Sequence, residues 1–135
     1  MSPLYMLDTN MVSHIIKGTY PGVQKHLLNT PMDHICISAV TLGELRYGLA
    51  KRPDATRLHA LVQAFLVRID VLPWDSHVAN CYGDLRASME RVGKPLGNLD
   101  MMIAAHAKAT NVALISNDQA FRQIKGLHTL DWTKD

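Results

Sequence analysis

Short apolar runs alternate along this chain with longer segments whose apolar residues recur every three or four positions. The apolar runs cover residues 4–8, 34–40, 69–72, 112–116 and 127–131. Runs of this length predict strands, and the periodic segments between them predict helices. Strands that alternate with helices are typical of a parallel sheet covered by helices on both faces. The sequence therefore predicts a three-layer α/β fold with a central parallel sheet flanked by helices.

The helices are expected in the intervals between those strands. The periodic segments cover residues 10–17, 21–29, 41–52, 54–67, 76–91 and 99–110, with a short helical turn at 118–124 and a loop at 93–97. Asn10, Asp54 and Ser76 are expected to cap the helices that they begin, because short polar side chains accept hydrogen bonds from the first free amides of a helix.

Length and composition indicate one globular domain. A chain of 135 residues has the size of a single domain, which we expect to cover residues 1–135. No apolar stretch approaches the ~18 residues of a membrane span, and the first apolar run is too short for a signal peptide. Cys36 and Cys81 fit no metal spacing and no disulfide framework, so both are expected to be reduced core residues. These features predict a cytoplasmic protein without a membrane partner.

Four acidic residues stand where predicted strands or helices meet turns. They are Asp8, Glu44, Asp100 and Asp118, in a chain with twelve acidic residues in all. The ends of parallel strands meet at one edge of a sheet, where open α/β folds bind their ligands. Carboxylates gathered there repel one another unless a cation neutralises them, and Mg²⁺ and Mn²⁺ prefer such oxygen ligands. The arrangement favours a metal-dependent hydrolase.

Each of these acids also has a purely structural explanation. Asp8 and Asp118 suit turns, and Asp100 falls in the first turn of its helix, where the helix dipole stabilises an acid. Thr41 is followed three residues later by Glu44, which matches a capping box in which the Glu side chain reaches back to the helix start. Only the combination of four acids at one expected edge points to a site.

Neighbouring residues are expected to support the acids. Thr9 would hydrogen-bond within its turn and fix the Asp8 carboxylate, and Gly43 would permit a close approach beside Glu44. Two basic groups flank the acids: Arg46, Lys51, Arg52 and Arg57 follow Glu44, and Arg86, Arg91 and Lys94 precede Asp100. Although the net charge is only +2, basic residues on both sides of a metal site suit a polyanionic substrate.

Four motifs occur in a fixed order along nearly the whole chain. They are Leu-Asp-Thr-Asn at 7–10, Ser-Ala-Val-Thr-Leu-Gly-Glu-Leu at 38–45, the segment 97–107 that begins Gly-Asn-Leu-Asp, and Leu-Ile-Ser-Asn-Asp at 114–118. In this order they resemble the PIN-domain nucleases, and within them the VapC toxins of bacterial VapBC toxin–antitoxin pairs. The resemblance implies a PIN-like fold and an acidic triad that holds the metal, formed by Asp8, Glu44 and Asp100. Asp118 completes the set, with Asn117 as the alternative, because the family has Asp or Asn there.

The resemblance also implies an activity, a cofactor and partners. It implies a toxin endoribonuclease in which one or two Mg²⁺ or Mn²⁺ ions, held by Asp8, Asp100 and Asp118, lower the pKa of a bound water. Glu44 would bind metal through water or orient the nucleophile, and Ser116 would supply a hydroxyl beside the ligands. Finally, it implies a homodimer, a cognate VapB-type antitoxin, and a structured RNA target, with the anticodon stem-loop of initiator tRNA as the first choice.

Three other functions are weighed against this one. A phosphatase of the haloacid dehalogenase type needs a second Asp two residues after the first, where Asn10 stands. A histidine-based ribonuclease would draw on the seven histidines, but His106 lies six residues past Asp100 and away from the helix start, so the histidines are expected to be structural or on the surface. A non-catalytic nucleic-acid-binding or partner-binding module would be expected to have lost part of the acidic set.

Overall fold

Five parallel strands form the centre of the molecule. The computed structural model describes residues 3–93 and 96–134. The strands are β1 (Tyr5–Leu7), β2 (Ile35–Ser38), β3 (Asp70–Leu72), β4 (Ala113–Ile115) and β5 (Thr129–Leu130). They pair in the order β3-β2-β1-β4-β5, and every neighbouring pair is parallel. The predicted parallel sheet is confirmed.

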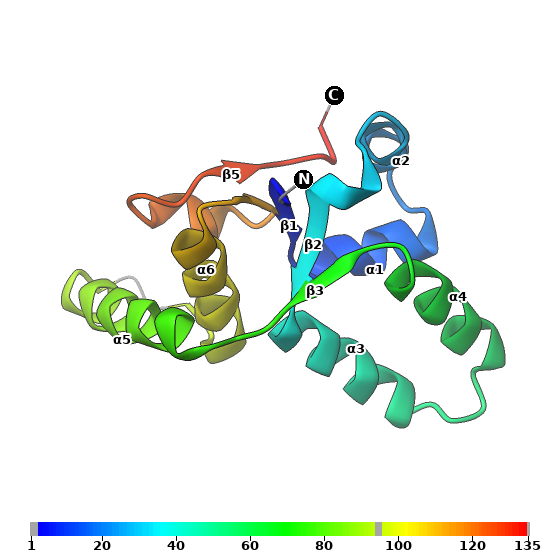
Figure 1. Cartoon of the computed structure of the whole chain (residues 1–135), viewed down its shortest axis with the longest axis horizontal. Coiled ribbons are helices and arrows are strands. Elements are labelled where there is room, and N and C mark those ends of the chain that lie inside the picture. The colour runs from blue at the N-terminus through cyan, green and yellow to red at the C-terminus, as the bar shows by residue number, and fades with distance from the viewer. Residues whose placement is uncertain (1–2, 94–95, 135) are drawn as a thin grey trace.

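Helices cover both faces of this sheet. They are α1 (Thr9–Lys17), α2 (Pro21–Leu28), α3 (Ala39–Ala50), α4 (Thr56–Leu66), α5 (Ser76–Arg91) and α6 (Asn98–Thr110), with short 3₁₀ turns η1 (Met32–His34) and η2 (Gln119–Gln123). Figure 1 shows α5 and α6 on one side of the sheet and α1 to α4 on the other. The fold therefore has the three layers that the sequence predicts. The predicted loop 93–97 falls partly on residues 94–95, which lie outside the described residues.

Two hydrophobic clusters hold the layers together, one on each face. In β1, Met6 packs in the cluster under α5 and α6, whereas Leu7 packs in the cluster under α1 to α4. The same alternation places Cys36 and Leu114 on the first face and their neighbours Ile35, Ile37, Ala113 and Ile115 on the second. Successive strand residues point to opposite faces, so strands buried on both faces must be continuously apolar. This explains the short apolar runs in the sequence.

The strand order reverses beside β1. From β1 the chain moves outward to β2 and β3, then returns across the sheet to β4 on the other side of β1. In open α/β sheets the crevice at such a switch point, outside the carboxyl ends of the strands, is where ligands bind. Asp8 directly follows β1 and Ser116 directly follows β4, so both lie at the carboxyl ends of the two strands that flank the switch point.

The start of α3 differs from the prediction. The Ser38 hydroxyl oxygen accepts a hydrogen bond from the Val40 amide at 3.1 Å, so the helix begins at Ala39, within the stretch expected to be strand. The strand β2 is shortened accordingly, because a residue cannot be both the last strand residue and the first helical one. Thr41 is thus inside the helix and does not cap it.

The predicted caps of three other helices were wrong by one or two positions. The observed caps are Asp8, Ala55 and Asp75, in place of Asn10, Asp54 and Ser76. Asp8 and Asp75 accept hydrogen bonds from amides three residues ahead, at 2.8 and 3.1 Å. In each case the chain turns into the helix one or two residues earlier or later than the side-chain types alone indicate.

Two further expectations can be compared with the structure. In the part of the chain that the structure describes, no helix combines the length and apolar character required to cross a membrane. Cys36 and Cys81 are both free thiols, and burial raises the pKa of the Cys36 thiol to about 12. Cys36 lies in one core cluster and Cys81 packs against it. The prediction of a core residue is therefore confirmed for Cys36, whereas Cys81 is half-buried at the border of the cluster.

Candidate metal centre at the carboxyl edge of the sheet

Asp8, Glu44, Asp100 and Asp118 lie at the carboxyl edge of the sheet, which we call the acidic edge. Asp8 lies at its centre, directly after the central strand β1. It is 3% exposed, and its Oδ1 accepts the Met11 amide at 2.8 Å, which starts α1 directly after β1. Its own amide donates to the Ile115 carbonyl at 3.1 Å, which fixes it beside the end of β4. The Asp8 backbone is therefore fixed to the end of β4, and its carboxylate is held at the switch point by the first turn of α1.

The surroundings of Asp8 disfavour its negative charge. Burial raises the pKa of its carboxyl from 3.8 to about 6, and the Ser116 side chain and the Met11 amide only partly oppose this. The negative charges of Asp100 and Asp118 raise the pKa further. A carboxyl in such a position needs a proton or a cation.

Asp100 approaches Asp8 from the opposite layer of helices. It lies half-buried in the first turn of α6, and the Met101 amide donates to the Gly97 carbonyl at 2.9 Å as the helix begins. Burial raises the pKa of the Asp100 carboxyl, and the charges of Asp118 and Glu44 raise it further. The helix-dipole explanation alone would favour the charged form, so it does not account for this shift.

Glu44 is held at the same edge by a hydroxyl from another segment. The Thr9 hydroxyl donates to Glu44 Oε1 at 2.7 Å and lies 3.1 Å from the Thr41 hydroxyl. Two expectations were therefore wrong: Glu44 forms no capping box with Thr41, and Thr9 fixes the Glu44 carboxylate instead of that of Asp8. No described segment of the protein approaches Gly43 closely, because a Cβ added there would meet no atom within 4 Å.

Asp118 forms the exposed end of the group. Its Oδ1 accepts the Ala120 amide at 2.9 Å and so caps η2, as its turn explanation expects. Its own amide donates to the Ser116 hydroxyl at 3.0 Å. Because the buried Ser116 side chain also interacts with Asp8, this hydroxyl links Asp8 to the turn that carries Asp118. Asn117 lies next to it and is half-buried.

The four acids form one electrostatic group. Asp100 interacts with each of the other three, and Asp8 also interacts with Asp118. Within the described residues, no three Asp, Glu, His or Cys side chains are close enough to form a ready-made metal cage. The donor set consists of carboxylate oxygens, which suits a hard divalent cation, and a nearby cation removes the cost of ionising Asp8 and Asp100. The residues present therefore fit Mg²⁺ or Mn²⁺.

The histidine alternative finds no support at His106. This side chain is fully buried, with Nδ1 2.8 Å from the Ser38 hydroxyl oxygen and no described partner for Nε2. Burial lowers its pKa, which Asp75 partly opposes. A neutral imidazole in the core cannot reach a substrate, so the expectation of a structural role is confirmed for this histidine.

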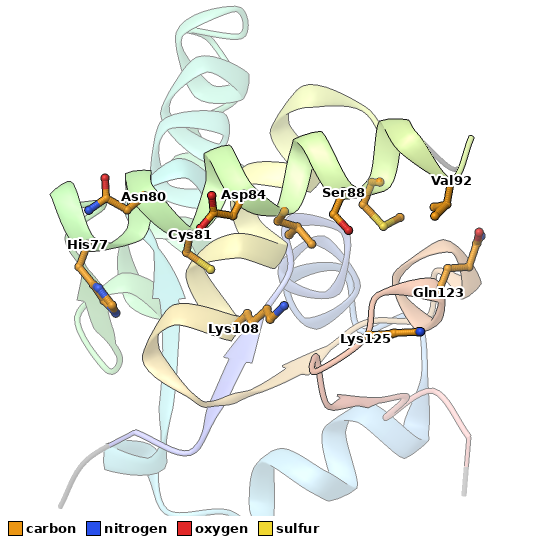
Figure 2. Close-up of a pocket in the computed structure, with 11 residues that line it drawn as sticks. His77, Asn80, Cys81, Asp84, Ser88, Val92, Lys108, Gln123 and Lys125 are labelled. Atoms are coloured by element: carbon orange, nitrogen blue, oxygen red, sulfur yellow. The ribbon is translucent and has the colours of Figure 1, made fainter.

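A sizeable cavity lies away from the four acids. It has a volume of about 680 Å³ and lies between α5, the last turn of α6 and the segment that follows β4 (Figure 2). Figure 2 shows His77, Cys81 and Asp84 on α5, with Lys108 and Lys125 opposite them. None of the four acids lines it. Cavity size therefore does not identify the candidate metal centre, whereas the convergence of acids does.

Comparison with known proteins places this fold and site in a family. The sequence model of the PIN domain matches residues 5–127. The "tRNA(fMet)-specific endonuclease VapC" of Shigella flexneri is 38% identical over 96% of this chain and 98% of its own length. The Salmonella typhimurium protein of the same name is 37% identical over 95% of this chain and 97% of its own length.

Solved structures agree with the sequence matches. The DNA-bound VapBC of Salmonella typhimurium matches with a TM-score of 0.89 and 35% identity, over 96% of this chain and 98% of the other. The VapBC2 of Rickettsia felis, bound to a promoter DNA fragment, matches with the same TM-score, 31% identity and the same coverage. The chain therefore belongs to the PIN-domain family, and within it to the VapC toxin ribonucleases of toxin–antitoxin pairs. This membership removes the haloacid dehalogenase alternative.

Proposed function

We propose that this ribonuclease hydrolyses RNA with Mg²⁺ or Mn²⁺ held by Asp8, Asp100, Glu44 and Asp118. One observation carries the proposal: Asp8 is buried at the switch point with its pKa raised to about 6, partly by Asp100 and Asp118. Asn would cap α1 as well as Asp and would carry no charge. The structural role therefore explains a polar residue at this position, and metal binding explains the carboxylate.

The side chains divide the work at this edge. When bound, a divalent ion supplies Lewis acidity toward water and the scissile phosphate. Asp8 and Asp100 are the buried ligands whose charges such an ion neutralises. The Thr9 hydroxyl keeps the Glu44 carboxylate oriented toward the edge, where it would position the attacking water. Ser116 fixes the turn that carries Asp118, the exposed fourth donor.

The proposed substrate is the anticodon stem-loop of initiator tRNA. Two relatives with more than a third of their residues identical to this chain carry the name tRNA(fMet)-specific endonuclease. An activity on tRNA would act in the cytoplasm and would inhibit translation. The alternative is a PIN-like module that binds nucleic acid without cleaving it.

The test is cleavage of purified tRNA. Initiator tRNA and elongator methionine tRNA would be incubated separately with the purified protein in Mg²⁺, Mn²⁺ or EDTA, and the RNA ends would be sequenced. We expect metal-dependent cuts in the anticodon loop of the initiator tRNA alone, and none with Asp8→Asn. Equal cleavage of both tRNAs would contradict the target. Wild-type protein that binds RNA and cleaves nothing would support the non-catalytic alternative.

We further propose that a VapB-type antitoxin binds this chain, since the similar solved structures are toxin–antitoxin complexes. An apolar groove of about 370 Å³ between α1, α2 and α4 supports this proposal. It is lined by Ile15, Leu27, Leu28 and Phe65, and Leu28 is 87% exposed. An amphipathic antitoxin segment would bury this surface.

Inhibition by the antitoxin is the corresponding measurement. The antitoxin encoded beside this chain should suppress tRNA cleavage by the wild type and should suppress cleavage by Leu28→Asp much less. Equal inhibition of the two proteins would place the antitoxin elsewhere on the surface. The homodimer implied by the family resemblance stays a prediction, which analytical ultracentrifugation of the purified chain would check.

A further inference from the structure

Two adjoining cavities extend from Glu44 along the helices on one face of the sheet. The first, of about 260 Å³, lies between α1, α3 and the start of α4, and Thr9 and Glu44 line it together with Lys17, Lys51 and Arg52. The second, of about 530 Å³, shares Lys17 and Arg52 with the first and continues to Arg57. The two form one continuous surface, the basic groove, defined by Lys17, Lys51, Arg52 and Arg57.

The cations of the basic groove are available to a ligand. All four side chains are exposed. Among the described residues the only salt bridge joins Arg86 to Glu90, so none of the four is paired with an acid. The groove's own acids are Glu44, at the metal-centre end, and Asp54, near Arg57. The surface between these two acids carries an uncompensated positive charge.

The backbone that carries these cations is well supported. The Arg52 amide donates to the Leu49 carbonyl at 3.0 Å, and the Arg52 carbonyl accepts the Ala55 amide at 3.1 Å. His59 Nε2 lies 3.0 Å from the same carbonyl and ties the turn to α4. Lys51 Nζ lies 4.5 Å from the centre of the Tyr47 ring, a cation–π distance that favours one side-chain position.

The structure separates the two basic groups that the sequence placed near the acids. Arg86 is engaged by Glu90 at 3.2 Å and by the Tyr82 hydroxyl at 2.8 Å, and Lys94 lies outside the described residues. Lys51, Arg52 and Arg57 line the groove, and the fold adds Lys17 from α1. Of the two basic groups, the one that follows Glu44 therefore supplies the cations of the basic groove, which is continuous with the acidic edge.

We propose that the basic groove binds the phosphodiester backbone of the RNA segment next to the scissile phosphate. This inference rests on the proposed function and adds the path of the substrate. Lys51, the C-cap of α3, is seven positions past Glu44, about 10 Å at the helical rise, so a strand with its scissile phosphate at the acids has its next few phosphates over the groove. Exposed Lys and Arg in series suit phosphates without regard to base identity. The acids would hold the cation beside the scissile phosphate, and the cations of the groove would bind the phosphates that follow it.

The test measures RNA binding apart from cleavage. Fluorescence anisotropy would follow a fluorescein-labelled RNA with the anticodon stem-loop sequence of initiator tRNA, in EDTA, over a range of KCl concentrations. The variants are Lys51→Gln/Arg52→Gln and the quadruple variant that adds Lys17→Gln and Arg57→Gln. The matched control is Lys25→Gln/Lys134→Gln, which removes two exposed charges that do not line the groove. Thermal melts would verify that every variant is folded.

We expect the groove variants to weaken binding tenfold or more at 0.1 M KCl. The slope of log affinity against log salt should fall by about 0.7 for each phosphate that the variant no longer neutralises. Lys51→Arg/Arg52→Lys should bind like the wild type, because phosphate binding depends on charge. If the groove variants match the control pair, the proposal is overturned. It is also overturned if they bind RNA normally and lose affinity only for an acidic peptide such as decaglutamate.

The failure of this proposal can be told from failure of the proposed function. Wild type that binds the stem-loop through the groove but cleaves nothing in Mg²⁺ or Mn²⁺ would reject the nuclease assignment and keep the groove. Wild type that cleaves, with groove variants that cleave and bind equally well, would reject the groove alone.

Discussion

The inner and outer acids of the acidic edge differ in burial and in their hydrogen-bond partners. Asp8 and Asp100, the inner pair, are buried or half-buried and have raised pKa values because the fold withdraws water and brings them together. Asp118, an outer member, is exposed and caps η2, and Glu44 is oriented by the Thr9 hydroxyl. Ionisation of the inner pair lowers the stability of the folded protein, because burial disfavours the charge. The outer pair instead accepts hydrogen bonds, Asp118 from the Ala120 amide and Glu44 from the Thr9 hydroxyl. Metal binding should therefore depend most on the inner acids.

The largest effect is expected from Asp8→Asn. The variant keeps the cap on α1 and loses the buried charge, so Mn²⁺ binding and tRNA cleavage should fall by about 10³-fold, or ~4 kcal/mol of transition-state stabilisation. Single-turnover cleavage and calorimetric titration with Mn²⁺ would measure both losses. Asp84→Asn, on the exposed face of α5, is the matched control and should leave both unchanged. Cleavage by Asp8→Asn within a few-fold of the wild type would remove Asp8 from the metal centre.

The same substitution should stabilise the metal-free protein. A carboxyl pKa raised from 3.8 to about 6 means that the wild type is fully stabilised by the proton below pH 3.8 and loses this contribution as pH rises through about 6. At pH 7 ionisation of Asp8 therefore lowers the free energy of unfolding by up to about 3 kcal/mol, and Asp8→Asn avoids this loss. Denaturant unfolding in EDTA should show the variant to be more stable at pH 7 and the difference to vanish below pH ~4. A variant less stable than the wild type at pH 7 would show that the charge of Asp8 does not lower the stability of the metal-free protein.

Thr9→Val is the test of the outer acid Glu44. The change removes the hydroxyl that donates to Glu44 Oε1 and keeps the branched shape, so cleavage should fall by about tenfold while the protein stays folded. Thr9→Ser retains the hydroxyl and should restore most of the activity. If Thr9→Val and Thr9→Ser cleave equally, the hydrogen bond does not position Glu44.

The smallest effect is expected from Asp118→Asn. Asn can still accept the Ala120 amide, and the exposed position has only a weak hold on a cation, so cleavage should fall by roughly two- to fivefold. Asn117→Ala, measured alongside, decides which neighbour supplies the fourth donor. A larger loss from Asn117→Ala than from Asp118→Asn would transfer that role to Asn117.

The order of elements follows from the sequence because it depends on local periodicity and burial. Each strand is apolar on both faces, as the alternation of Met6 and Leu7 between two clusters shows, and this marks it in the sequence. Helix caps were predicted less well, because the backbone conformation of the turn decides which amide donates to the capping side chain. Asp8 accepts from the Met11 amide and Ser38 from the Val40 amide, so both helices begin earlier than the side-chain types indicate. The sequence alone could also bring Asp8, Asp100 and Asp118 to one edge, since each follows a strand or stands in the first turn of a helix. Glu44 lies further along α3, in its second turn.

Contacts between distant segments could not be predicted from the sequence. Thr9 meets Glu44 across 35 positions, and His106 meets Ser38 across 68. Lys17 gave no signal of its own, because its charge matters only once α1 packs beside α3 and α4. In each case the sequence contains the chemical group but not its partner, since packing of the helices on the sheet decides which groups meet.

The register of the central strand has a consequence for when this toxin becomes dangerous to the cell that makes it. β1 lies between β2 and β4, and Tyr5 pairs with Ala113, more than a hundred residues later. The four acids come from positions 8, 44, 100 and 118, so a chain still being synthesised has the first two and lacks the others. Assembly of the four acids into the proposed metal centre must wait until β4 has left the ribosome and joined the sheet. The fold thereby delays the onset of nuclease activity until translation of the toxin itself is nearly over.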